Sequence, residues 1–495
     1  MAHSKQTLDP TDWHAFRSQA HVMLDDMLDY LEHLRQRPVW QPVPEAIHQR
    51  FREPLPREGR HLTELHQRFL EEIMPYSLGN AHPGFMGWVQ GGGTPLGMLA
   101  DMLAAGLNAN VGGREQIPIS VERQILQWMR DLFEFPVTAN GVFVTGTSIA
   151  NFIAVLIARS KALGVQVRET GLAETGATLT AYTSAGAHGC VSKAMDMAGF
   201  GTHALRLIPM NSNYQIDLQQ LQQQLATDRA AGMQPFLIIG SAGTVDVGAI
   251  DDLNGLADIA AQHGCWFHVD GAYGALGMFS TKVAPKLAGI QRAASIAFDF
   301  HKWGQVPYDA GYILVRDGAD QLATFSAPAN YLQRESRGMA AGSPWPCDLG
   351  PDLSRGFRAL KTWFTIAGFG TQRLGDMIDG TCALAAELAR LISQHPELEL
   401  LAPVNLNIVC FRFRGTGEAD VQMNQLNQLN NEIVIRLQEA GQVAPSSTIL
   451  DGKFAIRAAI VNHRTTRFDI TNLVESVLYQ GTLLTTSPAL QPNLN

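Results

Sequence analysis

Short apolar runs alternate with longer segments of helical periodicity through the middle of the chain. The runs lie at residues 142–145, 179–184, 236–241, 266–270, 295–299 and 312–316. Apolar runs of this length, bounded by turn residues, are typical of buried strands, and strands that alternate with helices favour a parallel sheet. The pattern therefore predicts an α/β domain with a mostly parallel sheet.

The two ends of the chain show different patterns. Residues 12–36 place apolar side chains at helical spacing, and a proline-rich connector follows at 38–56. Beyond residue 375, a helical segment is followed by strand-like runs at 407–413 and 454–461, with a helix near 421–440 between them. We therefore expect an N-terminal helical segment (1–80), a large α/β domain (81–375) and a small C-terminal α+β domain (376–495).

The composition excludes several classes of protein. The chain has 495 residues, of which 46% are hydrophobic, and a formal net charge of -9, which argues against a partner such as nucleic acid or an anionic membrane. The polar N-terminus predicts no signal peptide, and polar residues interrupt the longest apolar stretch, so we expect no membrane span. Five scattered cysteines without CxxC spacing favour a reducing cytoplasm. The histidines show no ligand spacing, and we expect no metal.

Lys302 lies close behind one predicted strand, and Asp270 is the last residue of another. Open α/β sheets bind ligands at the carboxyl ends of strands, where partial burial would lower the pKa of a lysine and free its amine for a Schiff base. A carboxylate there can keep a pyridinium nitrogen protonated, and Ala272 is small enough for a flat ring to lie against it. Each residue alone has an ordinary explanation, namely a solvated lysine and a helix N-cap. Their separation of 32 residues (302 − 270) fits one helix and a return strand.

Three further segments follow predicted strands. Thr147 and Ser148 stand near the start of a predicted helix, where they could bind phosphate or simply cap the helix. His188 lies in a glycine-rich turn, where its imidazole could stack on an aromatic cofactor and pass protons, or form hydrogen bonds within the loop. Thr244 could reach a cofactor or Asp270, or serve as a turn residue.

Taken together, these segments resemble the group II amino-acid decarboxylases that depend on pyridoxal 5′-phosphate (PLP), a family that includes aromatic-L-amino-acid, histidine and glutamate decarboxylases. The resemblance rests on HVDGAYG at 268–274 followed by HKW at 301–303, and it extends from about Ala81 to Thr466. It implies the aspartate-aminotransferase-like fold (fold type I), PLP as the cofactor, and an obligate homodimer whose subunits share the active site. The N-terminal helical segment would then wrap the partner subunit.

The resemblance also implies the reaction and the roles of individual residues. The reaction would be decarboxylation of an L-amino acid to the amine, a carboxy-lyase activity. Lys302 would carry the cofactor as a Schiff base, and Asp270 would pair with its pyridine nitrogen. Arg457 would contact the substrate carboxylate. The other cofactor contacts would be ring packing by His188 and Ala272, phosphate binding by Thr147, Ser148 and His301, and support of the Asp270 side by Thr244.

Two positions depart from the family in ways that bear on the chemistry. The tyrosine that returns a proton to the reacting carbon in aromatic decarboxylases would fall near residues 345–346, where there is none, and Tyr331 earlier in the same loop is the substitute. This departure leaves a decarboxylating oxidative deaminase or aldehyde synthase open, besides an aminotransferase. Asp299 stands where animal enzymes have asparagine near the phosphate, so it needs a proton or a partner, for which His301 is the nearest in sequence.

The expected substrate pocket is also unusual. Residues 110–118 lack the aromatic residue expected for an indole or catechol, and they offer Arg114 instead. An inward Arg114 would favour an acidic or polar substrate, although charged side chains are usually exposed. Phe85 and Trp88 are expected as pocket walls. A non-catalytic binding protein on the same fold is disfavoured, because the lysine, the strand-end acid and the histidine are all present.

Overall fold

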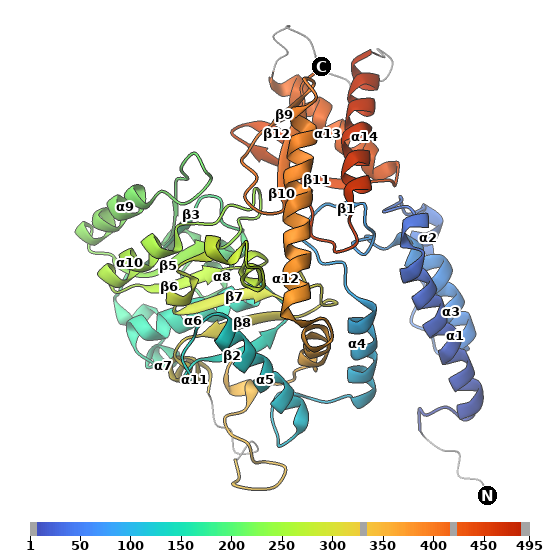
Figure 1. The fold of residues 1–495 in the computed structure, drawn as a ribbon. Helices are drawn as coiled ribbons and strands as arrows, with labels where there is room; N and C mark the ends of the chain where they lie inside the picture. The colour runs from blue at the N-terminus through green and yellow to red at the C-terminus, as the bar shows by residue number, and fades with distance from the viewer. Residues whose placement is uncertain (1–6, 327–333, 416–422, 487–495) are drawn as a thin grey trace, which may run out of the picture.

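The strands form two separate sheets in the computed structural model, which describes residues 7–326, 334–415 and 423–486 (Figure 1). The larger sheet has the order β2-β8-β7-β6-β5-β3-β4 and the smaller one the order β1-β11-β12-β10-β9. In the larger sheet, β3 to β7 pair in parallel, and β8 runs antiparallel to both of its neighbours. The predicted α/β class with a mostly parallel sheet is confirmed.

All six apolar runs of the sequence become strands of the larger sheet. Three of the predicted runs begin and end at the same residues as the observed strands. The pattern did not predict β4, because β4 is a short edge strand whose Leu207 is exposed. The strands are β2 (Asn140–Val144), β3 (Leu179–Ser184), β4 (Leu205–Ile208), β5 (Gln234–Ser241), β6 (Trp266–Asp270), β7 (Ser295–Asp299) and β8 (Gly311–Val315).

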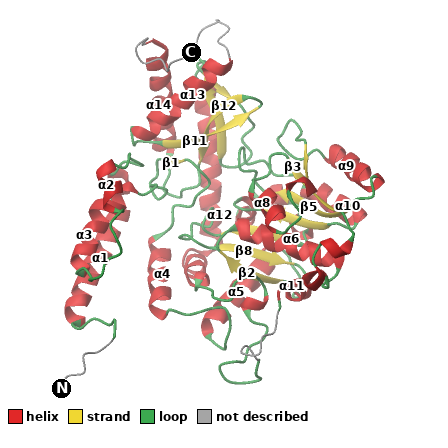
Figure 2. Cartoon of the chain, turned by 180° about the vertical axis from the view of Figure 1, so that it is seen from behind, coloured by secondary structure: helices red, strands yellow, loops and turns green. Residues whose placement is uncertain are grey.

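Helices cover both faces of the larger sheet (Figure 2). Successive side chains of β5 divide between two apolar cores: Ile238 belongs to one core, and Leu237 and Ile239 to the other. Because both faces are buried, successive side chains of β3, β6, β7 and β8 are all buried, rather than alternately buried and exposed. One core includes α5 (Ile117–Leu132), α9 (Leu218–Ala230) and α10 (Leu253–His263), and the other includes α6 (Thr147–Leu163), α8 (Cys190–Met197) and α11 (Gly318–Phe325), with the short α7 (Val167–Thr170) nearby.

The smaller sheet is covered by C-terminal helices around a third core. Its first strand comes from residues 85–86, within the range expected for the large domain, and pairs in parallel with β11. The long helix α12 (Arg358–Ser393) connects the two sheets and contains a non-helical Gly370 (φ 73°), a backbone conformation that side chains disfavour. The other elements are β1 (Phe85–Met86), β9 (Leu398–Leu400), β10 (Ile408–Phe413), β11 (Ala444–Leu450), β12 (Lys453–Ala459), α13 (Met423–Glu439) and α14 (Arg467–Thr486).

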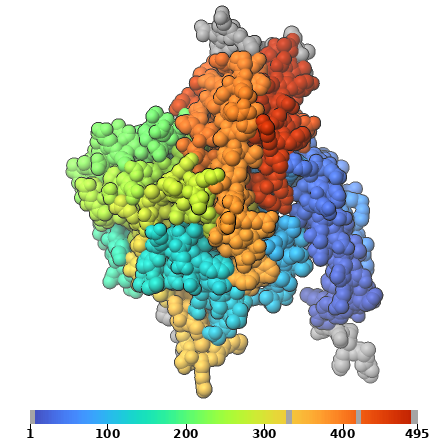
Figure 3. Space-filling view, viewed as in Figure 1, coloured from blue at the N-terminus to red at the C-terminus, as the bar shows by residue number. Residues whose placement is uncertain are grey.

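The N-terminal helices stand beside the body of the molecule (Figure 3). The helix α1 (Trp13–Glu32) begins where Asp12 accepts hydrogen bonds from the backbone of its first turn, and none of its residues is buried. The helices α2 (Glu45–Arg50), α3 (Leu62–Arg68) and α4 (Pro95–Leu107) follow. Within the described ranges, no helix combines the length and the apolar character needed to cross a membrane.

Candidate active site

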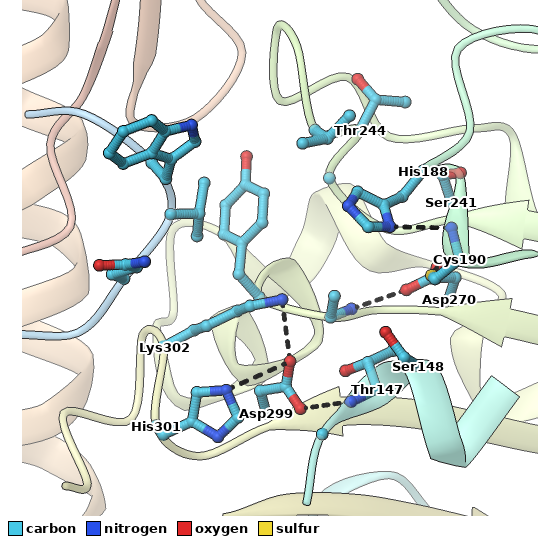
Figure 4. A pocket seen from close by; sticks show the side chains of 18 of the residues that line it. Thr147, Ser148, His188, Cys190, Ser241, Thr244, Asp270, Asp299, His301 and Lys302 are labelled. Carbon is cyan, nitrogen blue, oxygen red and sulfur yellow. Dashed lines mark hydrogen bonds and ion pairs between the residues drawn. The ribbon is translucent and has the colours of Figure 1, made fainter. Parts of the chain in front are cut away.

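The carboxyl ends of five strands meet at one edge of the larger sheet. Since β8 is antiparallel to both β2 and β7, β2 runs in the same direction as β3, β5, β6 and β7. The residues that follow these ends surround a cavity of about 410 Å³ (Figure 4). Its walls include every residue that the sequence assigns to the cofactor: Thr147, Ser148, His188, Thr244, Asp270, Ala272, Asp299, His301 and Lys302.

Lys302 reaches into this cavity and pairs with a carboxylate. Its Nζ lies 2.8 Å from Oδ2 of Asp299, and its side chain is 22% exposed. Burial lowers the pKa of Lys302, but the charge and hydrogen bond of Asp299 outweigh burial, so the pKa is raised. The expectation of a lowered pKa is therefore wrong, because it did not include the acid three residues earlier.

Asp299 is 2% exposed and has a second partner. Its Oδ1 accepts a hydrogen bond of 2.8 Å from the backbone N–H of Thr147, the first residue of α6. His301, the partner expected from the sequence, is farther away, with Nε2 at 3.7 Å from Oδ2. The His301 Nδ1 accepts a hydrogen bond from the Ala310 backbone, and burial lowers the pKa of this histidine. The principal partner of Asp299 is therefore Lys302.

The N-terminus of α6 forms one end of the cavity. The hydroxyl of Thr147 is buried and has no hydrogen-bond partner within the described ranges, and Ser148 is exposed toward the cavity. An unpartnered hydroxyl at the start of a 17-residue helix suits an anionic oxygen, because the helix dipole and the terminal amides favour negative charge. This end of the cavity fits a phosphate group.

Asp270 closes β6 at another wall of the cavity and is 6% exposed. Its Oδ2 accepts a hydrogen bond of 2.9 Å from Asn151 Nδ2, and its Oδ1 accepts one of 3.1 Å from the Ala272 backbone. Thr244, expected beside Asp270, accepts a hydrogen bond from the backbone of Ala249 in its own turn. Asn151 was not among the residues expected at the site. Its signal in the sequence was a polar residue one turn after Thr147 in an otherwise apolar helix.

His188 follows β3 and faces the cavity from the side opposite Thr147 (Figure 4). Its Nδ1 accepts a hydrogen bond of 3.1 Å from the backbone of Cys190, which fixes the orientation of the ring. Burial raises the pKa of the Cys190 thiol to about 12, so this cysteine is a neutral packing residue. An imidazole held at this place can cover one face of a flat ring.

One of the two aromatic residues expected in the cavity wall lies there. Trp88 and also Tyr308 line the cavity, whereas Phe85 does not. Phe85 is 3% exposed and packs against Val39 and Ala444, because β1 is drawn into the smaller sheet. The ring of Phe85 therefore supports Trp88, 6.3 Å away between ring centroids, instead of forming the wall of this chain's cavity.

Arg457 lines the cavity but uses most of its donors elsewhere. It is 3% exposed, and burial lowers its pKa. A guanidinium has five N–H donors, and four of those of Arg457 donate hydrogen bonds to protein acceptors. The acceptors are the carbonyl oxygens of Gly87, Val245 and Asp246 and the hydroxyl of Ser446. The arginine thus fixes the turn after β5, and one Nη2 hydrogen has no acceptor within the described ranges.

Arg114, singled out from the sequence as a substrate contact, does not line the cavity. Arg114 is exposed, and its guanidinium lies 4.5 Å from the ring centroid of Trp345, outside the cavity. Trp345 is 1% exposed and donates a hydrogen bond from Nε1 to the carbonyl of Ala341. Tyr331 lies outside the described residues.

Known proteins resemble this chain over most of its length. The pattern of the pyridoxal-dependent decarboxylase conserved domain matches residues 44–414. An aromatic-L-amino-acid decarboxylase from Bacillus atrophaeus is 30% identical over 468 residues, which cover 93% of this chain and 94% of the relative. A phenylacetaldehyde synthase from Arabidopsis thaliana is 27% identical over 471 residues, which cover 92% and 94%.

A solved structure shows the same architecture. The crystal structure of Oryza sativa TDC with PLP and tryptamine aligns with a TM-score of 0.87 at 23% identity, and the alignment covers 97% of this chain and 100% of the other. At this level of identity the likeness concerns the fold, and it confirms the predicted fold type I.

Proposed function

Because the chain belongs to the pyridoxal-dependent decarboxylase family, we propose that it converts an L-amino acid to the corresponding amine with PLP held on Lys302. The chain is an enzyme of the carboxy-lyase class, and PLP is its cofactor. One observation carries the assignment of residues: Lys302 and Asp270, from two different strands, converge on one cavity that also receives the N-terminus of α6.

The residues of this cavity hold and orient the cofactor. Bound PLP supplies an electron sink for the electron pair released when the bond between Cα and the carboxylate breaks. Asp270 accepts hydrogen bonds with both oxygens, so it can act as the carboxylate that binds the protonated ring nitrogen. The hydroxyls of Thr147 and Ser148 would bind the phosphate at the positive end of the α6 dipole, since the N–H of Thr147 already donates to Asp299. His188 and Ala272 pack against the two faces of the ring.

Asp299 controls the proton on Lys302. The amine must lose this proton before it can bind an aldehyde, and the Asp299 carboxylate at 2.8 Å stabilises the protonated amine and so opposes that loss. Whenever the amine of Lys302 is not bonded to the cofactor, it would pair with Asp299 as it does in this structure. This pairing keeps the lysine in the cavity and ready for product release.

A second candidate function, decarboxylating oxidation to an aldehyde, is favoured by one observation. Trp345 fills the place where the family tyrosine is expected, and its ring lies under two guanidinium groups, those of Arg334 (3.6 Å) and Arg114 (4.5 Å). A buried indole offers no hydroxyl that could return a proton to carbon. In the oxidative route, one amino acid, one O₂ and one water give one aldehyde, CO₂, ammonia and hydrogen peroxide.

We also propose that the enzyme is a cytoplasmic homodimer with a shared active site. The helices α1 and α4 expose large apolar side chains, including Trp13 (59%), Val22 (49%), Met102 (51%) and Leu107 (65%). Apolar surface of this extent is typical of a subunit interface. The five cysteines are all free, which agrees with a reducing compartment. Light scattering after size exclusion should give twice the chain mass of 54.0 kDa.

The experiment that tests the function is a panel of L-amino acids incubated with the PLP-loaded enzyme. Each reaction is scored for CO₂, amine, aldehyde, keto acid and peroxide. CO₂ and amine in equal amounts support the decarboxylase, whereas CO₂ with aldehyde and peroxide selects the second candidate. A keto acid without CO₂ would contradict both and indicate an aminotransferase. Lys302→Ala should abolish turnover, and Lys161→Ala, at an exposed ion pair with Asp320, is the matched control.

A further inference from the structure

A continuous chain of buried hydrogen bonds runs from Asp270 into the core. Asn151 Nδ2 donates to Asp270 at 2.9 Å, and Asn151 Oδ1 lies 2.8 Å from Nε2 of His268. The other nitrogen of His268, Nδ1, lies 2.8 Å from the hydroxyl oxygen of Ser295, which also accepts a 2.8 Å hydrogen bond from Trp266 Nε1. Asn151, His268 and Ser295 are each at most 1% exposed, so the chain is sealed from solvent.

The carboxylate of Asp270, which accepts from Asn151, fixes the direction of every bond in this chain. A carboxylate only accepts, so the amide of Asn151 must turn its NH₂ group toward Asp270 and its oxygen toward His268. His268 must then carry its proton on Nε2, which leaves Nδ1 as the acceptor for the Ser295 hydroxyl. Each of these groups has one consistent role, and reversing any of them would bring two acceptors together.

The protonation of His268 agrees with this order. Burial lowers the pKa of His268 to about 3, so the imidazole is neutral near pH 7 and has a single N–H. Trp266 can only donate, and its bond to the Ser295 oxygen leaves the Ser295 hydrogen for His268. The far end of the chain is therefore fixed as well.

The helix α6 joins this chain to the other end of the cavity. Asn151 and Thr147 are four residues apart on α6, so they lie on the same face of the helix, about one turn of 5.4 Å apart. Thr147 stands at the phosphate end, and Asn151 touches the acid at the ring-nitrogen end. The helix α6 therefore sets the distance between the two groups that hold opposite ends of the cofactor.

We propose that Asn151 and His268 are positioning residues that hold Asp270 as an oriented carboxylate and thereby keep the cofactor's ring nitrogen protonated. This inference rests on the proposed pairing of Asp270 with that nitrogen. The competing explanation is that the chain only satisfies buried polar groups, as any protein core must. The two explanations differ in what they predict for the ring nitrogen.

The test uses the full-length protein, PLP labelled with ¹⁵N in its ring, and the variants Asn151→Leu and Ser295→Ala. The ¹⁵N chemical shift reports whether the ring nitrogen is protonated, and a titration of cofactor-free protein gives the dissociation constant of PLP. Asn151→Leu removes a hydrogen bond to a charged group, so it should weaken PLP binding by about 10- to 100-fold and move the shift toward neutral pyridine. Ser295→Ala lies two hydrogen bonds farther from Asp270, so it should move the ¹⁵N shift in the same direction by a smaller amount.

Ser160→Ala is the matched control, because Ser160 is a buried residue of the same helix whose hydroxyl has no hydrogen-bond partner within the described ranges. It should leave both the shift and the affinity unchanged. An unchanged shift in Asn151→Leu would overturn the inference, whether or not the affinity falls. If Asn151→Leu does not fold, an unchanged ¹⁵N shift in Ser295→Ala would also overturn the inference. Wild-type protein that fails to bind PLP, or binds it with a neutral ring nitrogen, would instead refute the proposed function.

Discussion

Acidification from pH 7 to pH 5 should destabilise the fold through His268. Its imidazole is 0% exposed, and burial lowers its pKa to about 3, well below the ordinary value of about 6.5. In this pH window the unfolded chain binds a proton at His268 that the folded chain does not bind. The contribution of His268 to the free energy of unfolding is therefore fully present above pH 6.5 and is lost as the pH falls toward 3. For one such group, the loss of unfolding free energy between pH 7 and pH 5 is about 2 kcal/mol.

The assay compares urea unfolding of the cofactor-free wild type and His268→Gln at both pH values, followed by tryptophan fluorescence. The variant loses a buried network and starts less stable, so the readout is the change with pH. The wild type should lose about 2 kcal/mol more than the variant on acidification. Burial also lowers the pKa of His463 to about 4, but this histidine is present in both proteins and its contribution cancels. His14→Gln, on the exposed face of α1, should behave as the wild type. Equal pH dependence of wild type and His268→Gln would refute the reasoning.

Two further predictions concern the cavity, and a third concerns a buried ion pair outside it. Asp299→Asn removes the charge that raises the pKa of Lys302, so PLP should react with Lys302 about tenfold faster at pH 7. The visible absorption band of the bound cofactor reports this rate. An unchanged rate would contradict the role of the Asp299–Lys302 pair. Thr147→Val should weaken PLP binding about tenfold in a titration but leave the melting temperature of the cofactor-free protein unchanged, because the hydroxyl has no protein partner within the described ranges. Glu122→Ala leaves Arg355, its buried partner at 2.6 Å, without a counter-charge and should cost about 3–5 kcal/mol in urea unfolding, so a loss below about 1 kcal/mol would be unexpected.

The strands beside the cavity could be predicted closely from the sequence. β3, β6 and β7 are buried on both faces, so each is a short, mostly apolar or small-residue run that stands out from the helical segments around it. β11 (APSSTIL) and β1, of two residues, carry no comparable signal. They become strands because they pair with each other and β11 pairs with β12, and such long-range pairing is invisible to local periodicity.

The same contrast applies to the site. Lys302 and Asp270 could be placed near one another because strand ends in a parallel sheet share an edge. Their partners could not be predicted: Asn151 and His268 stand inside apolar runs, and packing joins them across 117 residues of sequence. A histidine in the centre of the apolar strand WFHVD was a usable signal, since a buried imidazole requires partners. The raised pKa of Lys302 was missed because Asp299 was considered only as a neighbour of the phosphate.

The most direct measurement is the location of the lysine that holds the cofactor. Borohydride reduction of the PLP-loaded enzyme fixes the pyridoxyl group on its lysine, and mass spectrometry of the digested protein then identifies the peptide. We predict a single labelled site at Lys302, in the HKW segment 301–303. A label on another lysine, or one spread over several, would contradict the convergence of Lys302 and Asp270 on one bound ring.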